Sequence, residues 1–220
     1  MPSRFFKNAV FASALTLAGA LFMPITEAGA TTLYPHTVEQ RTDISDYIIR
    51  GEVVEVWTEM DENGTVWTRA RVDVSNVLKG PDAPAEMIID SLGGTYGAHT
   101  TSVEARAVFS VHEELVAFLS LQKNGRYVPI GKFMGKYTVR RAPDTDRSHV
   151  ITWHPSPDVK FDARFLPHPA AEDRTYLDDL LTQVNDHVAT GWDGEPIPGV
   201  AITKLQKVNT PLYRTPHVQD

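Results

Sequence analysis

The sequence predicts a mainly β protein: a small antiparallel OB-like barrel, or a sandwich, with one C-terminal amphipathic helix and an extended tail. Residues 66–78 alternate between apolar and polar side chains, which is the period of a half-buried strand. Turn signals recur about every 8–12 residues across 46–140, as in small antiparallel sandwiches and barrels. That stretch holds only Pro81, Pro84 and Pro129, and proline cannot donate to a sheet ladder.

The individual strands follow from apolar runs and from the turns that separate them. Strands are expected at residues 47–57, 66–78, 86–92, 103–109, 115–121, 127–130 and 132–140. A change of apolar phase near Val53 and Val54 predicts a bulge or bend in the first strand. Residues 61–64 (Asp-Glu-Asn-Gly) and 123–126 (Lys-Asn-Gly-Arg) are typical of hairpin turns. Strands and helices do not alternate, so a parallel α/β sheet is not expected.

Beyond Ala142 the strand pattern weakens, because nine prolines follow that residue. We therefore expect the barrel domain to span residues 44–142, after a short N-terminal extension at 31–43. A loop-rich segment at 143–191 and a proline-containing tail at 192–220 complete the expected organisation.

One amphipathic helix is expected over residues 170–190. Proline at 169 suits a first helical position, and Gly191 suits the end of a helix. The apolar residues that recur at helical spacing are Leu177, Leu180, Leu181, Val184 and Val188. We expect this stripe to pack on the barrel, the alternative being a helix that binds a partner.

The first 30 residues have the three parts of a secretory signal peptide. Arg4 and Lys7 form a positive region, residues 9–23 are uncharged and apolar, and Ala28-Gly29-Ala30 is a small-x-small cleavage pattern. We expect cleavage after Ala30 and a secreted or periplasmic location. The alternative is an uncleaved leader, which would then be the chain's one contact with a membrane.

The composition excludes several classes of function. The 220 residues include no cysteine, which excludes disulfide scaffolds, zinc–thiolate sites, thiol catalysis and lipid attachment at a leader cysteine. The net charge is −7, and it becomes −8 without the leader, which holds two basic residues and one acidic residue. This acidity argues against nucleic acid as a partner.

Five segments resemble a recurring group of uncharacterised secreted bacterial domains. They are residues 46–54, 72–80, 92–94, 115–119 and 131–137. Their order is also similar to the oligonucleotide/oligosaccharide-binding (OB) type barrel of netrin-like modules and tissue inhibitors of metalloproteinases. The resemblance implies an OB-like barrel and a protease-inhibitor-like module. Those inhibitors chelate a protease metal through an amino-terminal cysteine, whereas the predicted mature terminus here is Thr31.

The glycine-rich loop at 93–102 is the first candidate binding site. It is the longest polar, aromatic-bearing loop of the predicted barrel, and binding loops commonly sit on rigid scaffolds. Its candidate ligand-binding residues are Thr95, Tyr96 and His99.

Trp57 and Trp67 flank the first hairpin and are the second candidate binding site, together with Arg69. If the 61–64 turn sets the register, the two indoles share one face as a cross-strand pair. They would then serve either as face packing or as a stacking platform for sugars or extended peptides.

The sequence offers little support for a metal site or a catalytic nucleophile. The run His112-Glu113-Glu114 puts three possible ligands together, but neighbouring residues of a strand face opposite sides, so a solvated turn is expected. His149 and His154 would likewise face opposite sides of a straight strand. The chain has no H-E-x-x-H, calcium-loop or G-x-S-x-G motif. We therefore assign no metal, cofactor or catalytic residue.

Together these observations favour an exported, non-enzymatic binding module whose partner is an exported protein, such as a protease, or a cell-envelope polymer. One alternative is an exported hydrolase with its site near the 93–102 loop. It would require His99, or His149 and His154, within hydrogen-bond reach of a serine or carboxylate. The other alternative is an inhibitor-like module that lacks the cysteine mechanism.

Overall fold

The computed structural model describes residues 34–81, 83–141, 146–154, 160–161, 167–168 and 171–201 of the 220-residue chain. The predicted leader with its cleavage site, most of the 155–169 loop and the tail beyond residue 201 lie outside the described residues.

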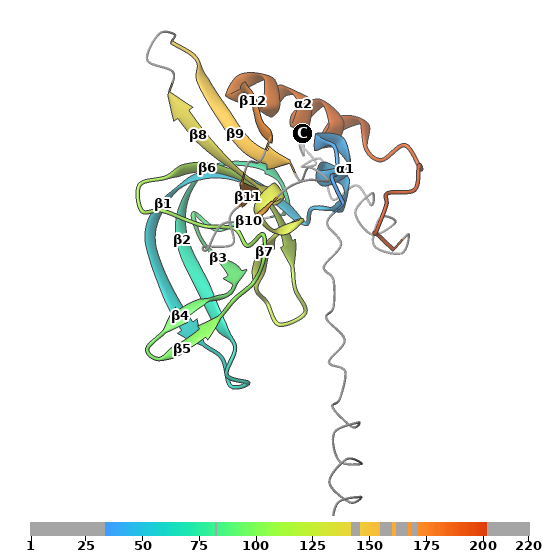
Figure 1. The fold of residues 1–220 in the computed structure, drawn as a ribbon. Coiled ribbons are helices and arrows are strands. Elements are labelled where there is room, and N and C mark those ends of the chain that lie inside the picture. The colour runs from blue at the N-terminus through green and yellow to red at the C-terminus, as the bar shows by residue number, and fades with distance from the viewer. Residues whose placement is uncertain are drawn as a thin grey trace, which may run out of the picture. The chain divides into compact units, whose positions relative to one another are not determined.

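The elements run along the chain as follows (Figure 1): α1 (Val38–Ile44), β1 (Tyr47–Met60), β2 (Val66–Lys79), β3 (Glu86–Leu92), β4 (Gly94–Tyr96), β5 (His99–Thr101), β6 (Glu114–Leu121), β7 (Tyr127–Pro129), the 3-10 helix η1 (Lys132–Gly135), β8 (Lys136–Arg141), β9 (Ser148–His154), β10 (Lys160–Phe161), β11 (Pro167–His168), β12 (Ala171–Tyr176) and α2 (Leu177–Thr190). The predicted fold class is confirmed, since the strands include a closed five-stranded barrel and α2 follows them.

The barrel closes because β1 pairs with two neighbours. It runs antiparallel to β2 along most of its length and antiparallel to β6 over Tyr47–Glu52. The ring is therefore β1-β2-β3-β7-β6, a strand order of the OB type. The contact between β3 and β7 is parallel and joins Ile89 to Tyr127. This short pairing is the exception to the predicted antiparallel barrel.

A bend in β1 lets the strand pair with both β2 and β6. The register with β2 slips between Val53 and Glu55, where the change of apolar phase predicted a bulge. Gly51 lies just before this point, and a Cβ there would stand 2.4 Å from the Asp73 carbonyl oxygen. Only glycine permits this close approach of the two backbones.

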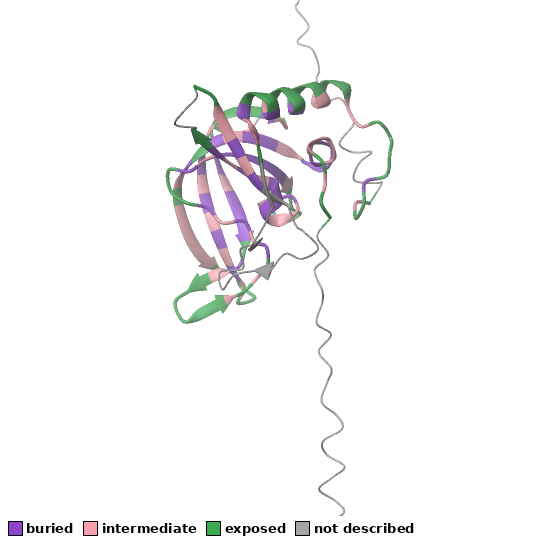
Figure 2. Ribbon diagram, turned by 45° about the horizontal axis from the view of Figure 1, so that its top comes forward, coloured by how far each residue is buried: buried purple, intermediate pink, exposed green. Residues whose placement is uncertain are grey.

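Two apolar cores share the barrel wall, so strand β6 is buried on both sides (Figure 2). Leu115, Ala117 and Leu119 point into the barrel, whereas Val116 and Phe118 point outward into the second core. The second core also takes in Ile48, Tyr137, Val139, Val150, Leu177, Leu180 and Val184. This double burial explains the uninterrupted apolar run that predicted β6.

The sheet continues beyond residue 142, because β8 pairs with β6, β9 with β8 and β12 with β9. The predicted helix begins at Leu177 rather than near residue 170. Residues 171–176 pair with β9 as strand β12 instead, so tertiary pairing outweighs the helix-start signal at Pro169. The helix ends before Gly191, as predicted. No helix among the described residues is long and apolar enough to cross a membrane.

The predicted strand at 103–109 was wrong. Ala105, Ala107 and Phe109 are buried in alternation, but residues 102–110 join no ladder, and the short β4–β5 hairpin precedes them. The carbonyl of Ala107 accepts from the Ser91 hydroxyl, and that of Ala105 accepts from an amide of η1. The alternation of side chains in this segment therefore reflects burial and not sheet pairing. The expected strand at 132–140 begins only after η1.

The N-terminal extension also contains a helix that the sequence did not predict. Helix α1 begins after Thr37, whose side chain accepts from the Gln40 amide while the Gln40 side chain accepts from the Thr37 amide. This reciprocal capping box satisfies two backbone donors at the start of a helix too short to stand alone.

Candidate functional site

The strand register arranges the outward side chains of β1, β2 and β3 in rows. The rows are Glu59–Trp67–Leu92, Trp57–Arg69–Asp90 and Glu55–Arg71–Ile88. We call Trp57, Trp67, Arg69, Asp90 and Arg126 the aromatic–arginine face, because Arg126 reaches this surface from the turn between β6 and β7.

Arg69 lies at the centre of the aromatic–arginine face and contacts a residue on each neighbouring strand. Its Nη1 donates to Glu59 Oε2 at 2.7 Å, and its Nε lies 2.9 Å from Asp90 Oδ1. Its guanidinium carbon stands 5.5 Å from the ring centroid of Trp57, within range of a cation–π contact. Arg69 therefore links β1 and β3 to β2.

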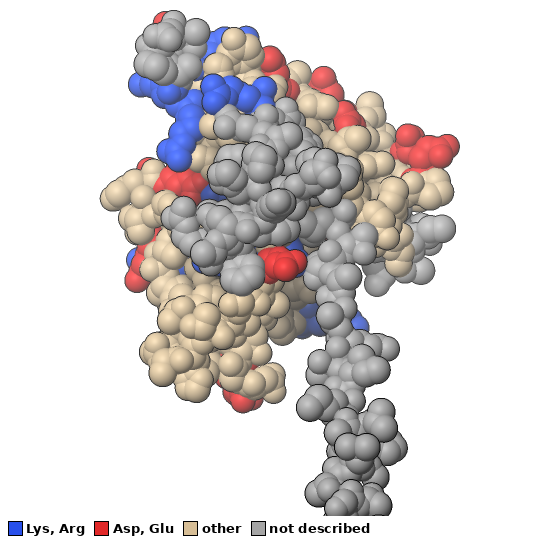
Figure 3. Space-filling view, in the orientation of Figure 1, with Lys and Arg blue, Asp and Glu red and all other residues tan. Residues whose placement is uncertain are grey.

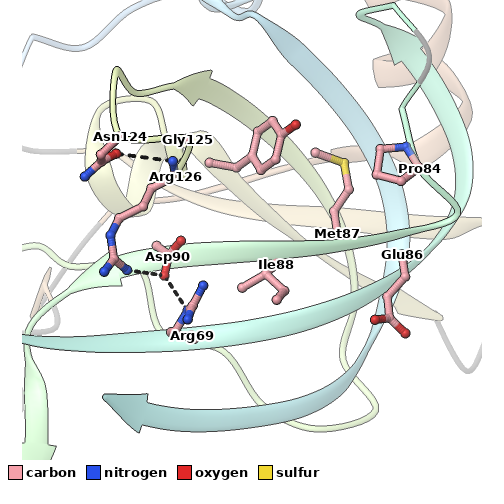
Figure 4. Close-up of a pocket in the computed structure, with 10 residues that line it drawn as sticks. Arg69, Pro84, Glu86, Met87, Ile88, Asp90, Asn124, Gly125 and Arg126 are labelled. Carbon is pink, nitrogen blue, oxygen red and sulfur yellow. Dashed lines mark hydrogen bonds and ion pairs between the residues drawn. The ribbon is translucent and has the colours of Figure 1, made fainter. Parts of the chain in front are cut away.

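Asp90 is the buried anion that positions two guanidinium groups (Figure 4). Its side chain is 2% exposed, and its Oδ1 also accepts from Arg126 Nη1 at 2.9 Å. Burial raises the pKa of Asp90 above its ordinary value, against the opposing effect of Arg69 and Arg126. Because a buried carboxylate needs such partners, Asp90 fixes both arginines beside the tryptophans.

Trp67 is held in one orientation by the β1–β2 turn and by Arg126. Its Nε1 donates to Asp61 Oδ2 at 3.0 Å, and the Arg126 guanidinium carbon lies 4.7 Å from its ring centroid. Asp61 Oδ1 also accepts from the amides of Asn63 and Thr65, each at 2.9 Å. The hydrogen bond from Trp67, followed by those from the backbone, lowers the pKa of Asp61.

The two tryptophans share a face, as predicted, but they do not form a directly opposed pair. Trp57 lies opposite Arg69, and Trp67 lies opposite Glu59, so the indoles are diagonal neighbours. Both side chains are half-buried. The full burial that would have excluded a stacking platform is therefore not observed.

A hollow of about 430 Å³ borders this face, between β3 and the β6–β7 turn (Figure 4). Arg69, Asp90 and Arg126 line it on one side, with Met87 and Tyr127 further along. The hollow thus extends the aromatic–arginine face with hydrogen-bond donors, hydrogen-bond acceptors and apolar side chains.

The charges on this surface are balanced locally. Arg71 pairs with Glu55 at 2.8 Å and lies 3.9 Å from Glu86. With Arg69 and Arg126, three guanidinium groups face five carboxylates, which are Glu55, Glu59, Asp61, Glu86 and Asp90. The surface therefore has no excess positive charge with which to attract a polyanion.

The other three predicted site residues lie elsewhere. Thr95, Tyr96 and His99 are exposed on the β4–β5 hairpin, which is fixed to β1 by the Thr58 hydroxyl donating to the Thr95 carbonyl at 2.8 Å. Thr58 follows Trp57 in the strand and so points to its opposite face. The hairpin and the tryptophans therefore lie on opposite sides of the β1–β2 ribbon. The surface over β4 and β5 is mostly uncharged in Figure 3, whereas basic side chains gather near the end of β8.

The described side chains that a hydrolase site would need do not converge. Ser91 is buried and donates to the Ala107 carbonyl at 2.8 Å, whereas Asp90 faces the outer surface. His149 packs against the Tyr176 ring at 4.5 Å between centroids, and the side chain of His154 lies outside the described residues. In the part of the chain that the structure describes, no three His, Asp or Glu side chains are placed to hold a metal ion.

The run at 112–114 is divided by the fold. His112 is 83% exposed, with its Nδ1 3.2 Å from Glu52 Oε1, as expected of a solvated turn. Glu113 differs, because it is buried and pairs with the buried ammonium of Lys136. Glu114 pairs instead with Arg50.

The residues that orient the tryptophans were not predicted as part of this site. The sequence indicates only a turn at Asp61, and Arg126 lies 36 residues from Asp90 in sequence. The position of Asp90 in the predicted strand at 86–92, at the same phase as Ile88, is the signal in the sequence that could have pointed to it. No family model and no curated protein sequence matches this chain. Its function is therefore inferred from the aromatic–arginine face.

Proposed function

We propose that this chain is an exported binding module that holds an extended, uncharged polysaccharide of the cell envelope on its aromatic–arginine face. The observation that carries the proposal is the pair Trp57 and Trp67. Both indoles are half-buried on one sheet face, and each has a guanidinium group on its ring. The C–H faces of sugar rings pack on indoles, and large aromatic side chains dominate the energetics of binding surfaces.

The position of the face also supports a binding role. In OB-type barrels the surface of strands 2 and 3, together with the loops between strands 1–2 and 4–5, binds oligonucleotides and oligosaccharides. Here the corresponding parts are β2 and β3, the turn that holds Asp61, and the turn that holds Arg126. All of them contribute side chains to the aromatic–arginine face or border it.

The balanced charge favours a neutral ligand. Carboxylates accept hydrogen bonds and guanidinium groups donate them. The acceptors Glu59 and Asp90 lie on either side of the donor Arg69. Sugar hydroxyl groups both donate and accept, so they suit this arrangement. A polyanion would instead gain little from arginines that are already paired, and the net charge of −7 would repel it. The hydrolase and protease-inhibitor alternatives remain predictions that no observation at this face favours.

Calorimetric titration with a series of neutral oligosaccharides tests the proposal. The series should include linear glucans and chains of N-acetylated amino sugars, with an anionic polysaccharide in parallel. We expect a neutral member to bind, and Trp57→Ala and Trp67→Ala each to weaken its binding at least about tenfold, equivalent to about 1.4 kcal/mol. Far-UV circular dichroism should show that both variants remain folded.

Trp192→Phe is the matched control, because Trp192 packs in a separate cluster with Ile44 and Ile197. It should bind as the unmodified chain does. If all three tryptophan variants bind the oligosaccharide with the affinity of the unmodified chain, the ligand lies elsewhere. Binding of the anionic polysaccharide alone would contradict a neutral ligand.

A further inference from the structure

Arg106 lies on the other side of β2 from the aromatic–arginine face. It lies between the buried residues Ala105 and Ala107, in the segment that joins β5 to β6. Its Nη1 is 3.5 Å from Thr68 Oγ1, and Thr68 points to the inner face of β2. Its Cδ lies 3.4 Å from where a Cβ on Gly93 would stand. The side chain therefore lies at the end of the barrel, beside the base of the β4–β5 hairpin.

The guanidinium of Arg106 is partly buried, and no described residue gives it a counter-charge, in contrast to other arginines of the chain. Arg50, Arg69, Arg71 and Arg126 each form an ion pair with a carboxylate. Among the described residues, the side chain of Arg106 has only its long contact with Thr68. Burial lowers the pKa of Arg106, and no acidic group among the described residues counteracts this effect. Partial removal of a charge from water is unfavourable, and a partner of opposite charge offsets that cost.

The contact with Thr68 leaves most N–H groups of the guanidinium without a protein partner among the described residues. The Thr68 hydroxyl donates its proton to the Gly93 carbonyl at 2.7 Å, so it offers Arg106 only a lone pair. A guanidinium presents five N–H donors in a planar fork, and one long bond satisfies few of them. That fork matches the oxygens of a carboxylate or phosphate group, which it binds through two parallel hydrogen bonds.

We propose that Arg106 anchors a second binding site, for an oxyanion of the carboxylate or phosphate class, at the end of the barrel beside the β4–β5 hairpin. This site does not depend on the proposed polysaccharide face, because the two lie on opposite sides of β2. A ligand oxyanion would supply the negative charge that the described chain does not place next to Arg106.

Thermal unfolding of the purified chain in acetate, in inorganic phosphate and in chloride at constant ionic strength tests the site. We expect the Tm to rise by about 4 °C, relative to chloride, when the recognised anion is at ten times its Kd. Arg106→Gln should lose this rise, and Arg106→Lys should keep only part of it, because an ammonium lacks the fork. A response to acetate alone or to phosphate alone supports the site and identifies the group.

Arg141→Gln is the matched control, since Arg141 is exposed on β8 and its replacement removes the same charge. It should respond to the anions as the unmodified chain does. An anion-dependent rise of equal size in Arg106→Gln overturns the proposal. A direct readout that needs no variant is the Hε–Nε resonance of Arg106, which should shift and saturate with the anion. An unmoved resonance also overturns the site.

Discussion

The barrel has a covered wall and an open wall, and strand β1 takes part in both. Near its start, the outward side chain of Ile48 is fully buried in the core that contains Leu180 of α2. Nine residues later, the outward side chain of Trp57 has an arginine on its ring instead. The covered wall is apolar because a helix and further strands remove it from water. The open wall keeps large aromatic side chains without such a cover, so packing beneath a helix does not account for them.

The two walls should differ in what they contribute to stability. A fully buried apolar side chain contributes about 1.5–3 kcal/mol, and Phe118, Val116 and Leu180 are each 0% exposed on the covered wall. Exposed ion pairs contribute about 0–1 kcal/mol each, and the Arg71–Glu55 pair of the open wall is of this kind. Substitutions on the covered wall should therefore mainly affect folding, and most of those on the open wall should mainly affect binding.

The largest expected effect is that of Phe118→Asp on the covered wall. A carboxylate there would lie unpaired beside Tyr137 in an apolar core. We expect the free-energy cost of burying it to exceed the free energy of unfolding of the domain. Val72→Asp should do the same inside the barrel, where Val72 is also 0% exposed. Circular dichroism with urea titration should show no cooperative transition for either variant. A folded Phe118→Asp chain would mean that this wall does not support the domain.

Asp90→Asn should have the largest stability effect on the open wall, a loss of about 2 kcal/mol in the free energy of unfolding. It removes the buried charge that neutralises Arg69 and Arg126. Glu59→Gln, at a carboxylate that is 41% exposed, is the control and should lose less than about 1 kcal/mol. Chemical denaturation measures both. Equal losses in the two variants would show that burial of Asp90 does not distinguish it.

The two walls were not equally predictable from the sequence. The alternation of apolar and polar residues predicted which side chains of β2 face inward and which face outward. A continuous apolar run predicted β6. Both predictions succeeded because local patterns depend directly on burial. The same alternation placed Trp67 and Arg69 on one face, and the register expected from the 61–64 turn placed Trp57 beside them. The contact between Arg126 and Asp90 was not predictable, since it needs the β6–β7 turn to pack against β3. The same limit explains residues 103–109, where alternation predicted the buried side chains correctly but could not tell whether a neighbouring strand paired with them.

A smaller effect is expected from pH at the β1–β2 turn. The pKa of Asp61 is lowered in the folded chain by the bond from Trp67 and by two backbone amides. Its contribution to stability is therefore fully present above the ordinary carboxylate pKa of about 4 and is lost as the pH falls through the lower folded value. Tryptophan fluorescence of the folded chain should change in that acidic window.

Asp61→Asn is the matched variant for this titration, because an amide oxygen can still accept from the turn amides but does not ionise. It should remove the acidic transition in fluorescence while leaving the barrel folded. If the transition persists unchanged in Asp61→Asn, another group is responsible for it, and Asp61 does not control the environment of Trp67.

The smallest effect is expected at His112, which belongs to neither wall. Its side chain is 83% exposed and only touches Glu52, so His112→Ala should change the free energy of unfolding by less than about 1 kcal/mol. The backbone of His112 has a φ of 65°, a left-handed conformation that glycine adopts without steric strain. His112→Gly should therefore be at least as stable as His112→Ala. Urea titration of the two variants measures the difference, and a large loss in both would mean that the His112–Glu52 contact stabilises the junction between β1 and β6.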